Sequence, residues 1–344
     1  MTPTSSAPTT PATDKPARLG RFVVREEIGR GSTGVVYLAH DPVIDREVAI
    51  KTFHGNLTPL ARKQHEQQFI NEARAAGRLA HAGIVTIYEV SSEGNATFIA
   101  MEYLHGRALG TLLDEGHLFS GDDVASISWK IADALDHAHR HGVIHRDIKP
   151  ANIFLVGDHQ PKLMDFGIAR APNRLMERRP LDDAPQTAFN ERLLGTPNYM
   201  SPEQAGGHTL DPRTDIYSLG AVMHEMLTGS KPFQAGDPDK LLQQIAQKTL
   251  PAPHQLAPGV PIALSRIVVK AMHKNPEKRY QTAEDMALDI KRHLTRSRRT
   301  RERAVKSPDG DQPANSPDFR QSRLFWPLCG ITLAIVIAAY TLWR

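Results

Sequence analysis

Short apolar runs between residues 28 and 104 predict extended strands in the first third of the chain. One run, VVYLA, covers 35–39 and follows a glycine-rich turn, and a second covers 48–51 and ends in a lysine. A third covers 98–104 and is apolar or aromatic except for one glutamate. Runs of β-branched and aromatic residues are typical of strands. Residues 60–79, between the second and third runs, have the spacing of a helix instead.

The longest apolar run covers residues 324–343 and predicts a transmembrane helix. It reads LFWPLCGITLAIVIAAYTLW and contains no charged residue. A helix of this length extends roughly 30 Å, which matches the hydrocarbon core of a bilayer. Trp326, Tyr340 and Trp343 lie near its ends, where interfacial aromatic residues are common. A buried core helix or a partner-binding helix is the alternative.

Basic residues gather just before this run. From residue 291 to the end there are 11 Lys or Arg against 4 Asp or Glu, a surplus of 7, whereas the whole chain has a net charge of only +4. The cluster RSRRTRER at 296–303 would suit nucleic acid, but its place before a membrane span indicates the cytoplasmic side. We therefore expect no nucleic-acid partner. We expect residues 291–323 to be attracted to anionic lipids, by about 1 kcal/mol per basic residue.

The flanking segments have a polar composition. Residues 1–20 are rich in Pro, Thr, Ser and Ala, so we expect them to be disordered and not to form a signal peptide. Residues 295–323 are expected to form a basic, disordered juxtamembrane linker. The single Cys329 excludes an internal disulfide and fits a reducing compartment. Because only Arg344 follows the apolar run, the sequence predicts a single-pass, tail-anchored protein whose main domain lies in the cytoplasm.

The motif HRDIKPAN at 145–152, followed by DFG at 165–167, carries the most specific chemistry in the chain. It places Asp147, Lys149 and Asn152 on one short loop, with Asp165 following later. Phosphoryl transfer from a nucleoside triphosphate needs a carboxylate to take the hydroxyl proton and a cation to offset the phosphate charge. It also needs an amide and a carboxylate to hold Mg²⁺. A polar surface loop is the alternative, and the length of the match argues against it.

A glycine-rich segment upstream fits the same chemistry. Residues 28–36 read IGRGSTGVV, and glycines allow backbone N–H groups to come close to phosphates. Dinucleotide-binding folds also use such glycines, but the β-branched run that follows favours a strand over the helix those folds require. Lys51 ends the next strand and needs an anion to hold it. On the helix at 60–79, Glu72 is favoured over Glu66 because of its register with the turn that follows.

Taken together, these motifs resemble a bacterial eukaryotic-like (Hanks-type) Ser/Thr protein kinase over about residues 22–294. The resemblance implies an α+β, two-lobed kinase domain at 21–294. Its N-lobe, at about 21–103, would hold a small antiparallel sheet and one regulatory helix. Its C-lobe, at about 104–294, would be mainly helical. The implied cofactors are ATP and Mg²⁺, and the implied partners are proteins with Ser or Thr hydroxyls.

The resemblance also assigns roles by position. Asp147 would be the catalytic base, Lys149 would contact the γ-phosphate, and Asn152 and Asp165 would bind Mg²⁺. Lys51 would hold the α- and β-phosphates and pair with Glu72. Met101 would be the gatekeeper, with hinge backbone groups at Glu102 and Leu104. The expected ATP-binding residues are Ile28, Gly29, Arg30, Gly31, Ser32, Thr33, Gly34, Val35, Val36, Ala49, Lys51, Met101, Glu102, Leu104 and Phe154.

Further residues are expected to support this site. Glu203 would pair with Arg279, and Asp215 would brace the catalytic loop from a buried helix. Thr187 is the expected autophosphorylation site, and Thr196 would lie in the substrate-facing loop. The histidines at 137, 139, 141 and 145 are close in sequence, but no cysteine or acidic ligand completes a metal set, so we expect none.

The expected function is therefore a membrane-anchored, autophosphorylating Ser/Thr protein kinase in signalling, at the cytoplasmic (inner) membrane of a bacterium. Self-association would serve phosphorylation in trans. Two alternatives remain: a catalytically silent membrane scaffold of kinase fold, and a small-molecule or lipid kinase. The complete motif set argues against the first, and the peptide-binding loop at 195–203 argues against the second.

Overall fold

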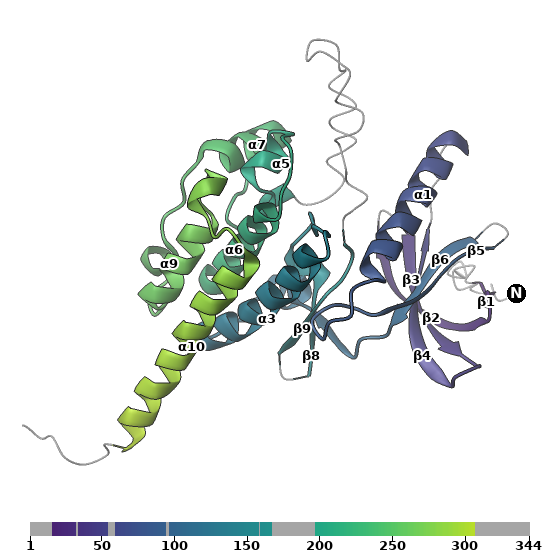
Figure 1. Cartoon of the computed structure of the whole chain (residues 1–344), viewed down its shortest axis with the longest axis horizontal. Coiled ribbons are helices and arrows are strands. Elements are labelled where there is room, and N and C mark those ends of the chain that lie inside the picture. The colour runs from purple at the N-terminus through teal and green to yellow at the C-terminus, as the bar shows by residue number, and fades with distance from the viewer. Residues whose placement is uncertain are drawn as a thin grey trace, which may run out of the picture. The chain divides into compact units, whose positions relative to one another are not determined.

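Antiparallel strands form the N-terminal lobe of the computed structural model, which describes residues 16–31, 34–53, 59–93, 96–157, 159–166 and 197–306. The sheet has the order β1-β2-β3-β4-β6-β5 (Figure 1). Its apolar faces close over a core centred on Phe22, Ile50 and Phe98, all of them buried. The strands are β1 (Arg18–Leu19), β2 (Phe22–Gly31), β3 (Gly34–Asp41), β4 (Arg46–Phe53), β5 (Ile87–Glu93) and β6 (Ala96–Glu102).

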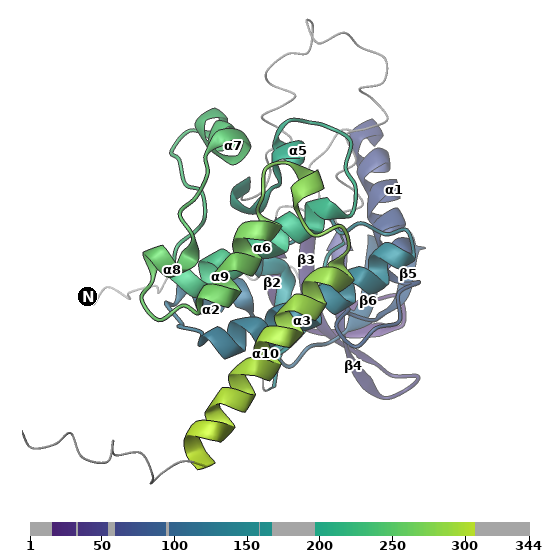
Figure 2. The same cartoon turned by 60° about the vertical axis from the view of Figure 1, so that its left-hand side comes forward.

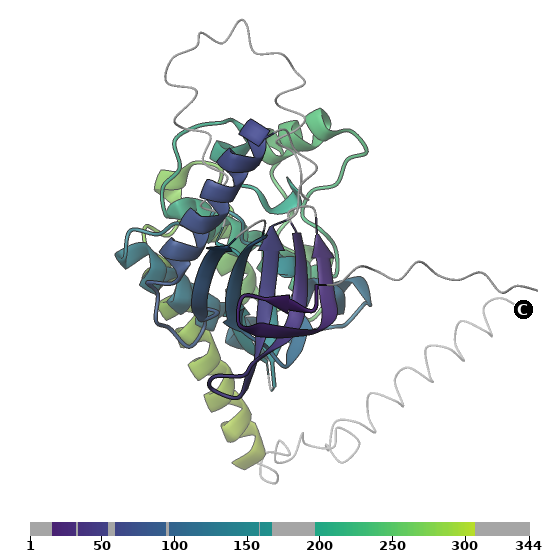
Figure 3. The same ribbon diagram turned by 90° about the vertical axis from the view of Figure 1, so that its right-hand side faces the viewer.

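One helix, α1 (Pro59–Ala76), packs beside strands β5 and β6 of this sheet (Figure 3). Phe69 and Ala73 on α1 are buried together with Ile99 of β6. The strands expected at 35–39 and 48–51 are thus confirmed, as is the helix expected at 60–79, although it ends at Ala76. The strand expected at 98–104 ends at Glu102, so the next two residues already belong to the connection between the lobes.

Helices make up most of the second lobe, together with a small sheet of order β7-β8-β9. The strands of that sheet are β7 (Gly106–Ala108), β8 (Ile153–Val156) and β9 (Gln160–Leu163). The helices are α2 (Leu109–Asp114), α3 (Gly121–Arg140), α5 (Pro202–Ala205), α6 (Arg213–Thr228), α7 (Pro238–Gln247), α8 (Pro253–Leu256), α9 (Ile262–Ala271) and α10 (Ala283–Lys306). Short 3-10 turns are η1 (Pro150–Asn152), η4 (Pro197–Tyr199) and η5 (Pro276–Lys278).

Helix α6 is the centre of this lobe. Its residues from Thr214 to Leu227 are all buried, and it packs against both α3 and α9 (Figure 2). A Cβ on Gly220 would lie 2.9 Å from the Cβ of Ala271, so the missing side chain allows α9 to approach closely. The helix ends where Gly229 adopts a left-handed conformation with φ 69°. A helix that is buried all round gives a rigid base for the loops at its N-terminal end.

The two lobes are joined by more than the connecting segment. The backbone N–H of Val85 donates to Leu163 O at 2.9 Å, and the N–H of Leu163 donates to Gly83 O at 2.8 Å. These bonds join the segment between α1 and β5 to strand β9. The two-lobed fold with a sheet-based N-lobe and a helical C-lobe is therefore confirmed.

Two expectations at the flanks need correction. Disorder was expected through residue 20, but β1 pairs with β2 through Arg18 and Leu19, and the N–H of Val24 donates to Ala17 O. A disordered linker was expected from 295, but α10 continues to Lys306. Residues 295–306 are rich in arginine and contain no Gly or Pro, so they are good helix formers.

Contacts divide the chain into two units, 1–295 and 296–344. Within the ranges that the structure describes, no helix is both long and apolar enough to cross a membrane. The expected transmembrane span at 324–343 lies outside those ranges, as do residues 1–15.

Candidate active site

The loop between α3 and η1 is held in place by a single buried carboxylate. Asp215, near the start of α6, is fully buried and accepts hydrogen bonds from the N–H groups of His145 and Arg146, both at 2.8 Å. The ring of His139 on α3 lies 2.8 Å from the same carboxylate. Burial alone would raise the pKa of Asp215, but the bond from His139 and the nearby donors hold it below the ordinary value. The expected bracing contact from α6 is present.

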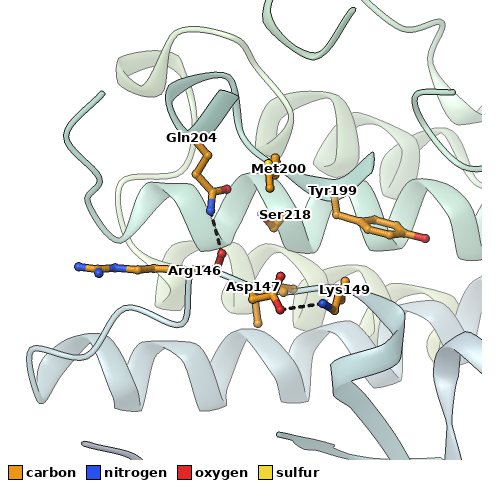
Figure 4. Close-up of a pocket in the computed structure, with 8 residues that line it drawn as sticks. Arg146, Asp147, Lys149, Tyr199, Met200, Gln204 and Ser218 are labelled. Atoms are coloured by element: carbon orange, nitrogen blue, oxygen red, sulfur yellow. Dashed lines mark hydrogen bonds and ion pairs between the residues drawn. The ribbon is translucent and has the colours of Figure 1, made fainter. Parts of the chain in front are cut away.

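Arg146 has an unusual backbone conformation that these contacts maintain. Its φ is 66°, in the left-handed region that residues with a Cβ rarely adopt. Its N–H is bound by Asp215, and its carbonyl accepts a bond from Gln204 Nε2 at 2.7 Å. Figure 4 shows the Arg146 side chain pointing away from Asp147. Fixing the peptide groups on both sides of Arg146 fixes the direction in which the next residue points.

The three chemical groups of the loop meet at Asp147. Lys149 Nζ lies 2.7 Å from Asp147 Oδ2 (Figure 4). Asn152 Nδ2 donates to the same oxygen at 3.0 Å and to the Asp147 carbonyl at 2.8 Å. A cation and an amide therefore orient one carboxylate. Because Asn152 uses its Nδ2 toward Asp147, its Oδ1 is directed elsewhere and suits a metal ion.

His145 links this loop to the segment that carries Asp165. Its Nε2 donates to the carbonyl of Met164 at 2.9 Å, and its ring packs against that of Phe166 at a tilt of 38°, with centroids 4.5 Å apart. Both rings are buried. Burial lowers the pKa of His145, so the ring stays neutral and keeps one donor and one acceptor nitrogen. Phe166 packed in the core positions Asp165, its neighbour, toward the N-lobe.

Lys51 and Asp165 form an ion pair between the lobes, with Nζ and Oδ1 2.8 Å apart. Desolvation raises the pKa of Asp165, but the charge of Lys51 and its hydrogen bond outweigh that effect and lower it. The carboxylate is thus ionised, and its side chain is 42% exposed. Oxygen donors of this kind, Asp165 with Asn152, are the ligands that Mg²⁺ prefers.

The expected pair between Lys51 and Glu72 stays a prediction, because the side chain of Glu72 lies outside the described residues. The alternative partner for Lys51, Glu66, makes other contacts. Glu66 accepts hydrogen bonds from the hydroxyl groups of Ser92 and Thr97 on β5 and β6. Glu72 lies one turn before Ala76, which is buried in the same cluster as Phe166.

Apolar side chains from both lobes meet where the adenine ring is expected. Ala49, Met101 and Leu104 are buried together, and Val36 and Phe154 pack against them. Val36 comes from β3 and Phe154 from β8, so the cluster brings together the expected roof and floor. Apolar side chains from the two lobes suit the flat faces of a purine, and this cluster is called the adenine slot below.

Glu102 can offer adenine only one backbone group. Its N–H donates to the carbonyl of Thr86 at 2.9 Å, so its carbonyl is the group that could accept from a base. Other expected nucleotide contacts lie on β2 and β3, where Arg30 pairs with Glu27 at 2.6 Å. These are Ile28, Gly29, Arg30, Gly31, Gly34 and Val35, whereas Ser32 and Thr33 lie outside the described residues.

A small pocket lies beside Asp147 and is lined by Tyr199, Met200, Gln204 and Ser218 as well as the loop itself (Figure 4). Its wall is rigid because the Tyr199 hydroxyl donates to the buried carboxylate of Glu225. Burial and this carboxylate raise the pKa of Tyr199, so the hydroxyl keeps its proton. Its volume is about 10 Å³, which is room for about one water molecule, and Asp147 is part of its wall.

Helix α5, which follows the pocket residues Tyr199 and Met200 in sequence, contributes Glu203 to the expected ion pair. Arg279 binds Glu203 through two nitrogens and two oxygens, each at 2.7 Å. The hydroxyl of Ser201 caps α5 and lies 3.1 Å from that of Thr214. Thr214 in turn donates to Glu203 at 2.7 Å.

Sequence reasoning missed several contacts of the site. Gln204 and the pair Lys162–Glu102 were not singled out, and the contact of His139 with Asp215 was not predicted. Residues 167–196 lie outside the described ranges, and with them Thr187 and Thr196. Among the residues that are described, no group of three or more His, Cys, Asp or Glu is arranged to hold a metal ion.

Comparison with known proteins agrees with this geometry. Residues 22–293 match the family model described as protein kinase domain. The chain belongs to the protein kinase family. It is also similar in fold to the crystal structure of the PknI kinase domain of Mycobacterium tuberculosis, with a TM-score of 0.60 and 24% identity. That match covers 80% of this chain and 97% of the other.

Curated relatives share more of the kinase sequence. The serine/threonine-protein kinase PknB of Mycobacterium leprae is 35% identical over 282 residues, which cover 81% of this chain and 44% of that protein. The serine/threonine-protein kinase PrkC of Bacillus subtilis is 34% identical over 305 residues, which cover 89% of this chain and 45% of that protein. The chain thus spans less than half the length of these relatives.

Proposed function

We propose that this chain is a serine/threonine protein kinase that transfers the γ-phosphate of ATP to protein hydroxyl groups. The observation that carries the proposal is the Asp147 carboxylate, bound by Lys149 and Asn152 beside a small open pocket. Across the lobes, Lys51 and Asp165 supply the charges that the phosphates and Mg²⁺ require. Asn152 and Asp165 would hold the metal.

When bound, Mg²⁺-ATP supplies the phosphoryl group and the metal charge that offsets its oxygens. The apolar slot around Ala49 and Phe154 would bind adenine and exclude water from that end. Asp147 would orient the substrate hydroxyl and take its proton, and Lys149 would stabilise charge on the transferring group. Because little covalent chemistry falls to the protein, positioning carries most of the rate.

The preference for Ser or Thr over Tyr rests on Lys149, whose place in the loop is that of Ser/Thr kinases. The names of the relatives support the same class. The test is incubation of purified protein with labelled ATP and a generic basic protein, followed by phosphoamino-acid analysis. We expect phosphoserine or phosphothreonine. Labelling of lipid or small molecules alone would favour the alternative kinase class, and binding of nucleotide without transfer would favour a scaffold.

Single substitutions then test the assigned roles. Asp147→Asn should lower kcat by about 10²–10⁴-fold while nucleotide binding persists, because the proton acceptor is lost but the slot is not. Lys51→Met should also inactivate by misplacing the phosphates. Near-normal kcat in either variant would remove the role given to that residue.

A membrane location is a further part of the proposal, and the uncharged run at 324–343 supports it. The kinase domain would lie on the cytoplasmic face of a bacterial inner membrane, with residues 291–323 near anionic lipids. Full-length protein should then sediment with membranes and resist carbonate extraction, and deletion of 324–344 should release it. Recovery of the full chain in the soluble fraction would exclude the span.

Autophosphorylation in trans at Thr187 completes the proposal. Arg146 precedes Asp147, and a phosphate carrying about −2 charge can bridge such an arginine to other basic groups. Mass mapping of active protein should find phosphate on Thr187. A Thr187→Ala variant as fast as the parent would exclude this site.

A further inference from the structure

A second ion pair between the lobes joins Glu102 to Lys162. Lys162 Nζ lies 2.8 Å from Glu102 Oε1 and 2.7 Å from Oε2, so both carboxylate oxygens are bound. The Thr86 N–H also faces Oε2 at 3.3 Å. The two side chains are only 16% and 26% exposed. Exposed pairs contribute little, but one that is mostly withdrawn from water and contacts both oxygens is held more firmly.

The position of this pair in the nucleotide site is what gives it significance. Glu102 ends β6, and its carbonyl is the backbone group available to adenine. Lys162 lies on β9 directly across from Phe154, which packs into the adenine slot. Lys162 is also three residues before Asp165, which pairs with Lys51. The ion pair thus joins the end of β6 to strand β9. Strand β9 lies beside Phe154 of the adenine slot and leads to Asp165.

The backbone contacts nearby leave a specific task for this pair. The bonds of Leu163 to Gly83 and Val85 join the lobes along one line of peptide groups. Lys162 is next to Leu163 and Thr86 is next to Val85, and both contact the Glu102 carboxylate. The ion pair therefore extends these inter-lobe contacts to the hinge and resists a change in the distance between the hinge and Asp165.

We propose that the Lys162–Glu102 ion pair is a positioning element for nucleotide, which aligns the hinge backbone with the carboxylate of Asp165. The inference rests on the proposed kinase function. It predicts that loss of the pair weakens nucleotide binding more than it weakens binding of the protein substrate. Breaking the pair by removing one partner leaves a mostly buried charge without its counter-ion, so the hinge must rearrange.

The experiment compares Lys162→Met, Glu102→Gln and the charge-swapped double variant Glu102→Lys with Lys162→Glu, all in the full chain. Lys130→Met is the matched control, since Lys130 binds Gln160 at 2.7 Å at the other end of β9. A fluorescent ADP analogue with Mg²⁺ reports binding directly, and KM for ATP, KM for the protein substrate and Tm are measured in parallel. The binding assay decides the inference even if the parent transfers no phosphate, so failure of the proposed function is seen separately.

We expect each single variant to raise Kd for the analogue and KM for ATP about tenfold, with KM for the protein substrate unchanged. The swapped double variant should recover most of the loss, and the control should bind as the parent does. Parent-like binding in both single variants would overturn the proposal. A lowered Tm with unchanged Kd in the single variants would mean that the pair contributes to folding alone. Tighter binding or faster turnover in these variants would mean instead that the pair restrains the hinge and opposes nucleotide binding. An equal loss in the control would also overturn it.

Discussion

Replacing Asp215 by asparagine should damage both stability and turnover, although residue 215 never touches substrate. The carboxylate is fully buried and receives the N–H groups of His145 and Arg146 and the ring of His139, each at 2.8 Å. Asparagine keeps the volume but offers one acceptor oxygen and an NH₂ group. That NH₂ group must face at least one of the present donors, so one bond is lost and the others lose their charge assistance.

The size of the effect follows from these contacts. A hydrogen bond to a charged group contributes about 1.5–3 kcal/mol, and a buried donor left unpaired costs a similar amount. We therefore expect Asp215→Asn to reduce the free energy of unfolding by about 2–4 kcal/mol. The left-handed backbone of Arg146, with φ 66°, stores about 1–3 kcal/mol of strain. Once its N–H is released the loop can relax, Asp147 moves, and kcat should fall about a hundredfold.

Urea denaturation gives the first quantity, and initial rates well below the unfolding temperature give the second. Asp211→Asn is the matched control, because Asp211 pairs with Arg213 at 2.7 Å but is 43% exposed, and it should cost under about 1 kcal/mol. The pKa of Asp215 is lowered in the fold, so its contribution should be present above about pH 4 and be lost as the pH falls. Equal destabilisation by the two variants would refute the argument. A destabilised Asp215→Asn enzyme with unchanged kcat would refute the link to loop strain.

Three further predictions concern stability. Gly106→Ala should lower the free energy of unfolding by about 2 kcal/mol or more, because its Cβ would lie 2.0 Å from a carbonyl oxygen of β8. A Cβ at Gly236 would contact nothing, so Gly236→Ala should leave the urea denaturation curve unchanged. Glu203→Gln should cost about 3–5 kcal/mol, since the side chain of Arg279 is fully buried and would keep an unpaired charge; a loss below 1 kcal/mol would contradict this. Burial lowers the pKa of Lys274 to about 8. The free energy of unfolding should therefore rise between pH 8 and 10.5, by at most about 3 kcal/mol relative to Lys274→Met. Parallel pH profiles for the two proteins would contradict this prediction.

The chemical groups of the site could be predicted from sequence because they lie on short, dense motifs. Asp147, Lys149 and Asn152 lie within six consecutive positions, and their mutual contacts need only the local fold of one loop. The strands that carry the adenine slot were predictable for a similar reason, since apolar runs of strand length are a local signal.

The long-range contacts of Glu203 with Arg279 and of Asp215 with the loop were predicted only through the family resemblance, and two other supporting contacts that join distant residues were not predicted. Gln204 and Arg146 are 58 residues apart, and Lys162 and Glu102 are 60 apart. Neither pair is marked by a periodic pattern of apolar residues or by a sequence motif. His139 is one of four closely spaced histidines, and the sequence around it does not indicate which residue its ring contacts. The partner becomes visible only when α6 is placed against α3.

The contrast between Asp147 and Asp215 bears on how such chains can change over evolutionary time. Asp215 maintains the loop from a buried position, so selection for folding alone would preserve it in a copy that had stopped working as an enzyme. Asp147 is only partly buried, and such a copy could exchange it while the fold survived. An intact Asp215 in a relative is therefore no sign of activity. Substitution of Asp147, Lys149, Asn152 or Asp165 is the change that distinguishes an inactive kinase from an active one.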